Sequence, residues 1–272
     1  MITLFVGAGY TGARVLERLP DAIALGRSRS GNERLDLDRD ERLRIELPAS
    51  YAVIYSVPPA SDQPGDPRLH RFLTLLPQPP ARIVYLSTTG VYGNRDGARV
   101  DETCESRPES ARAERRLAAE RLLAEWCTGR GTVAVVLRVP GIYGPGRLGT
   151  ESIRSGMPVL DEKDANPGNR IHVDDLAACC IAALSPDVPD GVYNVGDGDH
   201  RSGSWFTNEV ARQAGLPPPP AIGLAQAQTT FSPMRLSFLR ESRIVDTTKM
   251  REVLGVTPKY SDAADGIAAS LL

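Results

Sequence analysis

The chain has 272 residues, of which 41% are hydrophobic and 24% charged, and its formal net charge is −2. This composition is ordinary for a soluble globular protein, and the length allows a large buried core. The charge gives no basic field for nucleic acid or an anionic membrane, so we expect neither as a partner. No apolar run reaches the length of a membrane span, and the N-terminus has no signal-peptide pattern. We therefore expect a cytoplasmic protein.

Apolar periodicity predicts strands that alternate with helices along most of the chain. The predicted strands are 2–6, 22–25, 51–57, 82–87, 132–138 and 191–195, and the predicted helices are 11–19, 67–76, 109–127 and 174–185. Strands such as YAVIYSV are continuously apolar, which is typical of a parallel sheet buried on both faces. The pattern predicts right-handed crossovers and an α/β fold with a Rossmann-type doubly wound parallel sheet.

A glycine-rich loop follows the first predicted strand. It is the G-x-G-x-x-G sequence Gly7-Ala8-Gly9-Tyr10-Thr11-Gly12. Between a strand and a helix this motif is typical of dinucleotide binding. Gly7 would allow the tight turn, Gly9 the approach of the pyrophosphate, and Gly12 the close packing of helix on strand. The phosphates would meet free N–H groups at the helix N-terminus. The alternative is that the three glycines serve only the turn.

The residues after the second predicted strand bear on which dinucleotide binds. An NAD site usually has Asp or Glu there, which holds the ribose 2′-hydroxyl. Here the sequence is GRSRS, and the first carboxylate is Glu33. A guanidinium with a serine hydroxyl suits a 2′-phosphate, so Arg27 and Ser28 favour NADP over NAD. A solvated turn is the alternative, because arginine is abundant in this chain.

The strand and helix pattern loosens after residue 144. We predict a dinucleotide-binding Rossmann domain of residues 1–143 plus 171–198, and a smaller substrate-binding lobe of residues 144–170 plus 199–272. The PPPP run at 217–220 is expected to be a stiff connector.

The four cysteines follow no metal-binding or CxxC spacing, so no metal is expected. Cys179 and Cys180 lie in an apolar run, where we expect them to act as small buried hydrophobes.

Four further segments together resemble the short-chain dehydrogenase/reductase superfamily, in particular its NAD-dependent epimerase/dehydratase group. They are LSTTGVYG (86–93), LRVPGIYGPGR (137–147), IHVDDL (171–176) and YNVGDG (193–198). The resemblance covers nearly the whole chain and implies a nicotinamide cofactor and a small-molecule substrate. Family members often pair through the long helix, which makes a homodimer an expectation. The charged face of 112–125 argues mildly against a dry interface there.

The resemblance also assigns residues to the cofactor. Backbone groups of Pro140, Gly141 and Ile142 would hold the nicotinamide amide. Asp36 and Leu37 would line the adenine pocket, although Asp36 would equally serve as a turn residue. The other residues expected at the cofactor are Ser56, Val57, Pro58 and Ser87. The stretch from Ser56 to Pro58 departs from the family's small-residue pattern.

The catalytic pair of the family is missing. Family members carry Tyr-x-x-x-Lys on the long helix, and here Arg112 and Arg116 take those places. The spacing keeps both side chains on one helix face, but arginine stays protonated and cannot be a general acid or base near neutral pH. Arg116 would still act as a cation near the ribose. The alternative is a solvated face, with an i,i+4 pair between Arg116 and Glu120.

Several other side chains are candidates for the chemistry. Thr88 aligns with the family's catalytic Ser or Thr and would bond a substrate oxygen. Tyr92 and Tyr143 lie near predicted strand ends, where either would serve as a substitute acid or only pack by its ring. His172 could titrate near neutral pH, but its place before Asp174 and Asp175 favours a structural role or a helix cap by one of the aspartates.

A group of arginines in the predicted lobe is the last candidate. Arg147, Arg240 and Arg243 would form an anion pocket for the substrate. The sequence thus predicts an atypical, NADP-dependent oxidoreductase-like or epimerase-like protein with non-standard catalytic residues. Its substrate would be polar and sugar-nucleotide-like. The alternative is a non-catalytic NADP-binding sensor or scaffold, which would also keep the glycine loop and lose the tyrosine.

Overall fold

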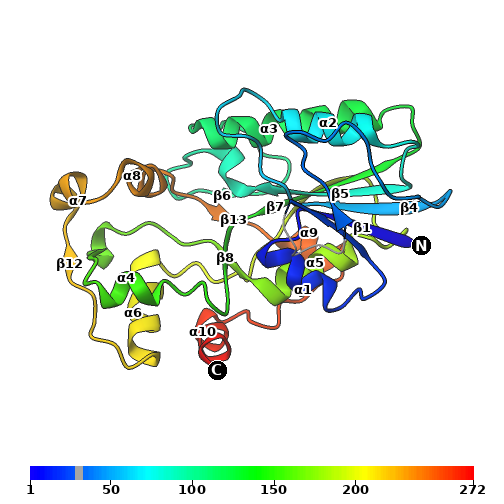
Figure 1. The fold of residues 1–272 in the computed structure, drawn as a ribbon. Coiled ribbons are helices and arrows are strands. Elements are labelled where there is room, and N and C mark those ends of the chain that lie inside the picture. The colour runs from blue at the N-terminus through cyan, green and yellow to red at the C-terminus, as the bar shows by residue number, and fades with distance from the viewer. Residues whose placement is uncertain (28–32) are drawn as a thin grey trace.

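A seven-stranded parallel sheet forms the centre of the computed structural model, which describes residues 1–27 and 33–272 (Figure 1). The strand order is β11-β7-β5-β4-β1-β2-β3. The strands are β1 (Ile2–Val6), β2 (Ile23–Gly26), β3 (Glu33–Arg34), β4 (Tyr51–Tyr55), β5 (Arg82–Thr88), β7 (Val133–Val139) and β11 (Gly191–Asn194). The order reverses between β1 and β4, and open α/β sheets bind ligands at such a switch point.

Helices cover both faces of this sheet. On one face lie α2 (Pro67–Leu75) and α3 (Ala111–Cys127), and on the other lie α1 (Tyr10–Leu16) and α5 (Val173–Ala182) (Figure 1). Each face buries its own apolar layer, with Phe72 and Leu123 in one and Val15 and Leu176 in the other. The predicted α/β fold with a Rossmann-type doubly wound parallel sheet is confirmed.

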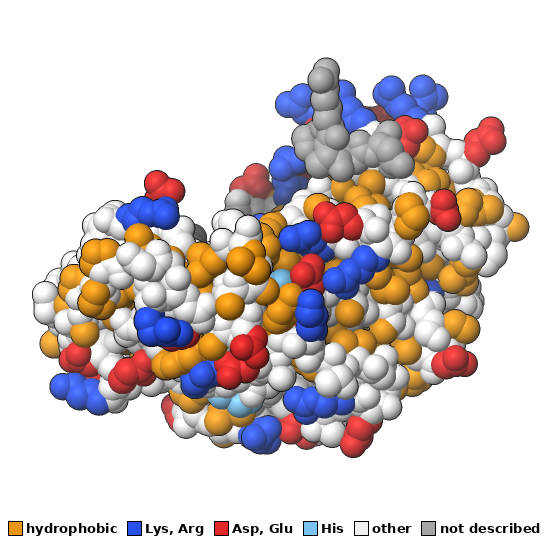
Figure 2. Space-filling model, turned by 90° about the horizontal axis from the view of Figure 1, so that it is seen from below, with side chains coloured by type: hydrophobic (Ala, Val, Ile, Leu, Met, Phe, Trp, Pro, Cys, Tyr) orange, Lys and Arg blue, Asp and Glu red, His pale blue; other side chains and the backbone are white. Residues whose placement is uncertain are grey.

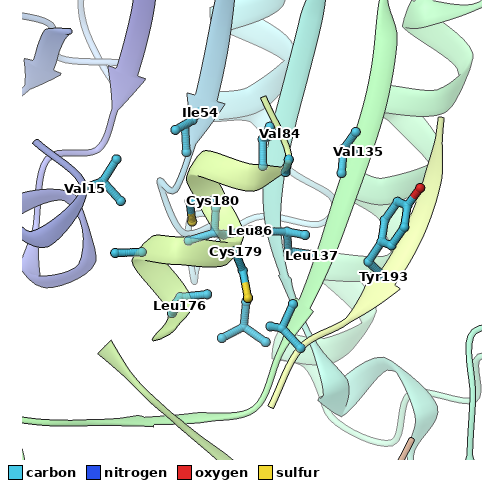
Figure 3. Close-up of a cluster of buried hydrophobic side chains, with 14 of the residues drawn as sticks. Val15, Ile54, Val84, Leu86, Val135, Leu137, Leu176, Cys179, Cys180 and Tyr193 are labelled. Atoms are coloured by element: carbon cyan, nitrogen blue, oxygen red, sulfur yellow. The ribbon is translucent and has the colours of Figure 1, made fainter. Parts of the chain in front are cut away.

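The layer under α1 and α5 contains the two adjacent cysteines. Figure 3 shows Cys179 and Cys180 of α5 among side chains that include Val84 and Leu137 of the sheet. Both cysteines are fully buried and neither forms a disulfide. Burial raises the pKa of the Cys180 thiol to about 12, so it stays protonated. Their predicted role as small buried hydrophobes is confirmed.

The remaining elements are short. Three two-stranded pairs join β6 (Arg99–Val100) to β13 (Ile244–Val245), β8 (Gly141–Tyr143) to β10 (Arg170–His172), and β9 (Val159–Leu160) to β12 (Ala221–Ile222). The other helical segments are η1 (Thr89–Tyr92), α4 (Thr150–Arg154), η2 (Glu162–Asp164), α6 (Gly203–Gln213), α7 (Leu224–Thr230), α8 (Pro233–Arg240), α9 (Thr248–Glu252) and α10 (Ala263–Leu271). The two-residue strands were not predicted, because such short runs show no periodicity.

The helices α4, α6, α7 and α8 lie together beyond the carboxyl ends of the central strands (Figure 1). They belong to the segments predicted as a smaller lobe, and the boundaries of that lobe stay a prediction. Part of the segment 199–272 lies elsewhere, however. Met250, Leu254 and Val256 pack in the same apolar layer as α5. The sequence did not predict this return of the chain to the main core, because no change in local composition marks it.

The surface carries charges of both signs. Figure 2 shows acidic and basic side chains interspersed over one face of the molecule. Among residues 1–27 and 33–272, no helix combines the length and the apolar character needed to cross a bilayer. The same residues contain no group of three or more His, Cys, Asp or Glu side chains arranged to hold a metal ion.

Gly12 gives a test of how closely α1 packs on the sheet. A Cβ added to Gly12 would lie 2.7 Å from a ring carbon of Phe5 on β1. We expect Gly12→Ala to lower the free energy of unfolding by about 1–3 kcal/mol, because a packed interior has no room for the methyl group. Urea unfolding measures this change. Gly203→Ala is the control, since nothing lies within 4 Å of the added Cβ. Equal stabilities of the two variants would contradict the expectation.

Candidate functional site

A first cavity of about 230 Å³ lies at the switch point between β1 and β4. Its walls come from the ends of β1, β2 and β4 and from Leu35, Leu37 and Asp38. It is lined by these predicted cofactor residues: Gly7, Ala8, Gly9, Arg27, Leu37, Ser56, Val57 and Pro58. The lining residues that were not predicted are Val6, Leu25, Gly26, Leu35, Asp38 and Arg68. The first cavity thus brings together eight of the residues that the sequence assigned to the dinucleotide.

The glycine loop has the geometry that a phosphate needs. Gly7 has φ +92°, in the left-handed region that favours glycine, and a Cβ there would lie 2.9 Å from Ser56 Oγ and from the Val57 amide nitrogen. Gly9 is the N-cap of α1, and no described side chain caps this helix. The amides of Tyr10, Thr11 and Gly12 in its first turn therefore remain for the oxygens of a ligand.

The side chain of Tyr10 has a different task. Its hydroxyl donates to the Pro145 carbonyl at 3.0 Å, and the Arg147 guanidinium stacks 3.9 Å from its ring centroid. Tyr10 thus ties the glycine loop to the loop after β8. Arg147, predicted for an anion pocket with Arg240 and Arg243, is used in this contact instead.

A cluster of opposite charges borders the first cavity. The Asp38 carboxylate accepts from Arg68 Nε and Nη2, each at 2.7 Å, and lies 3.4 Å from Arg27 Nη1. The Arg68 hydrogen bonds hold the pKa of Asp38 below its usual value, so the carboxylate stays ionised. Ser28, the other residue predicted here, lies outside the described residues. Asp36 is not in the cavity wall, and its carboxylate accepts the Asp38 N–H at 3.1 Å, as in a turn.

A second cavity of about 470 Å³ lies at the ends of β5 and β7. The predicted residues that line it are Ser87, Thr88, Arg112, Arg116, Pro140, Gly141, Ile142 and Arg243. Residues that were not predicted also line it, among them Asn169, Phe238 and Glu241. Segments from the sheet, from α3 and from residues 238–243 therefore meet around one space, which is where parallel sheets place their ligands.

The two arginines of α3 behave differently. Arg116 Nη1 donates to the Leu86 carbonyl at 2.8 Å and to the Tyr85 hydroxyl at 3.1 Å, so it is fixed to the end of β5. Arg112 is exposed, and its guanidinium lies 4.7 Å from the ring centroid of Phe238. The expected pair between Arg116 and Glu120 is wrong, because Glu120 has another partner. For Arg112, which is exposed, the alternative of a solvated face is not contradicted.

That partner is Arg138 of β7. Arg138 Nη2 donates to Glu120 Oε2 at 2.7 Å, and both side chains are more than nine-tenths buried. The Ser87 hydroxyl donates to the same carboxylate, and the Arg138 guanidinium stacks 4.7 Å from the Tyr92 ring. A charged residue within the apolar strand VAVVLRV was a signal for such a pair, because buried arginine needs a partner.

Thr88 and the two candidate tyrosines are placed differently. Thr88 Oγ1 accepts the Gly90 N–H at 3.2 Å at the wall of the second cavity. Tyr92 is fully buried, and its hydroxyl donates to Asn194 Oδ1 at 2.8 Å. Tyr143 packs edge-on against the rings of His172 and Phe206. Neither tyrosine lines the second cavity, so ring packing describes them better than a role as substitute acid.

His172 is structural, and it is itself the helix cap. Its Nδ1 accepts the Asp174 N–H at 3.2 Å, so no aspartate caps α5 as expected. Its Nε2 then donates to Ser270 Oγ at 3.1 Å, and burial lowers the pKa of the imidazole. Arg240, at the exposed end of α8, lines neither cavity, and of the predicted anion pocket only Arg243 reaches the second one.

A buried carboxyl, Asp197, lines a small cavity together with Pro140 and Asn169 of the second cavity's wall, and it makes stability depend on pH. Asp197 is 2% exposed, its Oδ1 accepts the Asp199 N–H at 2.9 Å, and its Oδ2 has no partner among the described residues. Burial raises its pKa to about 7. In the unfolded chain an Asp ionises near about 4. The native state therefore binds more protons than the unfolded state between these values, and stability is lost as pH rises through them.

We expect Asp197→Asn to remove this loss, since the amide does not ionise. From about pH 5 to about pH 8 the variant should gain stability relative to the parent protein, by roughly 1.4 kcal/mol for each unit of pKa separation. Urea unfolding at several pH values measures the difference. Asp21→Asn, at an exposed site, is the control. Parallel pH profiles for Asp197→Asn and the parent would rule out this titration.

Known proteins resemble the chain in sequence and in structure. The profile described as the NAD dependent epimerase/dehydratase family matches residues 71–196. A functionally unknown conserved protein from Silicibacter pomeroyi has a structure with a TM-score of 0.81 and 30% identity, covering 99% of this chain and 98% of that one. The human epimerase family protein SDR39U1 with NADPH has a TM-score of 0.76 and 19% identity, covering 100% of this chain and 99% of that one.

Among curated relatives, the 3-diazoavenalumate denitrifying reductase of a Streptomyces species is 28% identical over 139 residues. The alignment takes in 49% of this chain and 45% of the reductase. The chain spans about half the length of the curated relatives that it matches. The profile match, the full-length similarity and the parallel sheet with its glycine loop agree with the resemblance seen in the sequence. The chain belongs to the NAD dependent epimerase/dehydratase family.

Proposed function

We propose that the protein is an atypical member of this family that binds NADP and catalyses hydride transfer to a small polar substrate. The observation that carries the proposal is the pair of cavities along the carboxyl edge of the sheet. The first is bordered by the glycine loop and the second by Thr88 and the segment Pro140 to Ile142. A dinucleotide needs two such spaces at one sheet edge, one for adenosine and one for nicotinamide.

The charges at the first cavity support NADP over NAD. Two guanidiniums, of Arg27 and Arg68, share one carboxylate, so the cluster keeps one excess positive charge. Arg27 is the more available of the two, because 67% of its side chain is exposed and its contact with Asp38 is the longer one. A 2′-phosphate would pair with it through charge-assisted hydrogen bonds. A carboxylate holds the ribose 2′-hydroxyl in NAD sites, but both oxygens of Asp38 already accept from Arg68. The related human structure contains NADPH.

The residues at the second cavity suit chemistry without a tyrosine acid. A bound reduced nicotinamide would supply the hydride. The Thr88 hydroxyl accepts from Gly90, which leaves its own proton to donate to a substrate oxygen. Arg112 and Arg116 place positive charge at the same wall, where it stabilises a substrate that gains negative charge. The proton that completes a reduction then comes from water. The name of the Streptomyces relative, a reductase, also favours net reduction.

A non-catalytic sensor or scaffold is the second candidate, and the arginines in place of Tyr and Lys favour it. The two candidates differ in one observable. A sensor binds the cofactor without consuming it, while an enzyme oxidises NADPH when a suitable substrate is present. Either one gains thermal stability from NADPH, because a ligand of the native state stabilises it.

The preference for NADP is tested at Arg27. We expect NADPH to bind more tightly than NADH, and Arg27→Ala to weaken NADPH binding by about 10-fold or more, since a charge-assisted hydrogen bond contributes roughly 1.5–3 kcal/mol. NADH binding should change little. Titration of the reduced-nicotinamide fluorescence measures both affinities. Arg42→Ala, an exposed arginine outside the cavity, is the control. Equal affinities of the parent protein for NADPH and NADH would refute the preference.

The catalytic proposal is tested at Thr88. With NADPH and a panel of aldehydes and sugar nucleotides, the absorbance of the reduced cofactor reports turnover. We expect Thr88→Ala to lower kcat by about 10- to 100-fold through loss of a hydrogen bond to the developing charge, and Thr88→Ser to restore most of it. NADPH binding should be the same in all three proteins. Tight binding without turnover in the parent would favour the sensor.

A further inference from the structure

The second cavity adjoins a third cavity that the cofactor does not need. The third cavity has a volume of about 270 Å³ and lies between α6, α8 and residues 159–168. Pro167, Phe238 and Glu241 line both spaces, so the two meet at these side chains. A substrate held beside the nicotinamide can therefore extend past Phe238 into the third cavity.

The second cavity has cationic capacity that the protein itself leaves unused. Glu241 pairs with Arg243 Nη1 at 2.9 Å, which neutralises one of the guanidiniums in the wall. The Arg243 side chain is 10% exposed, yet its Nε is buried and has no partner within the described part of the chain. No carboxylate of residues 1–27 or 33–272 pairs with Arg112. A small anion fits these donors, because buried N–H groups are normally satisfied and guanidinium matches carboxylate.

The third cavity, in contrast to the charged second cavity, is mainly apolar. Its walls include Leu160, Phe231, Phe238 and Leu239. The one arginine in the wall, Arg235, is already engaged, since its Nη2 donates to the Pro158 carbonyl at 2.7 Å and its guanidinium stacks 3.7 Å from the Phe231 ring. An apolar ring placed between Phe231 and Phe238 would gain both burial and ring contacts.

Phe238 lines both the charged second cavity and the mainly apolar third cavity. Arg112 stacks on its ring, and 47% of the residue is exposed, which is unusual for a large apolar side chain at a cavity wall. A ligand ring in the third cavity would cover part of that surface. A carboxylate in the second cavity would lie beside the guanidinium that already contacts it. The positive charge of the second cavity and the apolar surface of the third cavity are therefore adjacent, with Phe238 between them.

We propose that the substrate is a small carboxylate that carries an apolar ring, with the carboxylate paired to Arg112 and hydrogen-bonded to the unpartnered Nε of Arg243, and with the ring in the third cavity. This assignment rests on the proposed function, because it takes the reacting carbon to lie beside the nicotinamide in the second cavity. It replaces the sugar-nucleotide-like substrate expected from the sequence with a substrate class of one negative charge and one apolar end.

Calorimetric binding of three probes tests the assignment. 4-Phenylbutyrate has both features, butyrate lacks the ring, and 4-phenylbutanamide lacks the charge. We expect 4-phenylbutyrate to bind at least about 10-fold more tightly than either of the others, since each feature contributes a factor of this order. Each titration is done on the full chain, with and without saturating NADPH. Equal affinities for the three probes would overturn the proposal.

Two variants then separate the two ends of the site. Arg112→Gln should remove the advantage of 4-phenylbutyrate over its amide and keep the advantage over butyrate. Thr207→Trp should do the reverse, because Thr207 lines the third cavity and the indole would fill it. Among the described residues, the Thr207 hydroxyl donates to the Gly203 carbonyl of its own helix, so its loss breaks no hydrogen bond to another element there. Arg121→Gln and Asn208→Trp are the matched controls on the exposed faces of α3 and α6.

The outcomes distinguish this inference from the proposed function. If NADPH does not bind but the probes keep their order of affinity, the substrate class holds and the cofactor proposal fails. If NADPH binds and neither Arg112→Gln nor Thr207→Trp changes the order of the probes, the substrate class fails and the cofactor proposal stands. A loss of all probe binding in both control variants would likewise overturn the assignment of the two ends.

Discussion

The buried ion pair between Glu120 and Arg138 sets the geometry of the site. Glu120 lies on α3, Arg138 on β7, and the same carboxylate accepts the hydroxyl of Ser87 at the end of β5. Breaking such a buried pair costs about 3–5 kcal/mol, because it leaves a charge without a partner. The pair therefore fixes one rotation of α3 against the sheet.

That rotation determines what the rest of the helix presents. Residues four apart share a helix face, so Arg112, Arg116 and Glu120 form one stripe. With Glu120 buried against β7, Arg116 reaches the carbonyl of Leu86 and Arg112 reaches the mouth of the second cavity. Along this stripe Glu120 forms the buried ion pair, Arg116 is bonded to the end of β5, and Arg112 is an exposed cation. In the family, tyrosine stands at the place of Arg112 and lysine at the place of Arg116. Here the same face carries two permanent positive charges, which suits the binding of an anion better than the movement of a proton.

The sequence predicted the sheet and the glycine loop well for a physical reason. Buried parallel strands are continuous apolar runs, and the requirements at Gly7 and Gly12 are local, a positive φ at one and close packing on Phe5 at the other. Local requirements leave a local signal. No equally direct local signal showed that Glu120 pairs with Arg138 or that Tyr92 is buried. Spacing suggested that Glu120 pairs with Arg116, but Arg138 lies in another element that folding brings to the same place.

The amino-acid sequence by itself determined the Rossmann-type fold, the cofactor loop and the loss of the tyrosine and lysine pair, because each depends on residue type and short spacing. Only the tertiary structure decided which charges meet. It placed Asp38 between Arg27 and Arg68, gave Glu120 to Arg138, and set Phe238 and Arg243 opposite α3. These contacts join residues that are distant along the chain, and their pairing follows from how helices and loops pack on the sheet. The chemistry available around the second cavity is therefore a property of the packing.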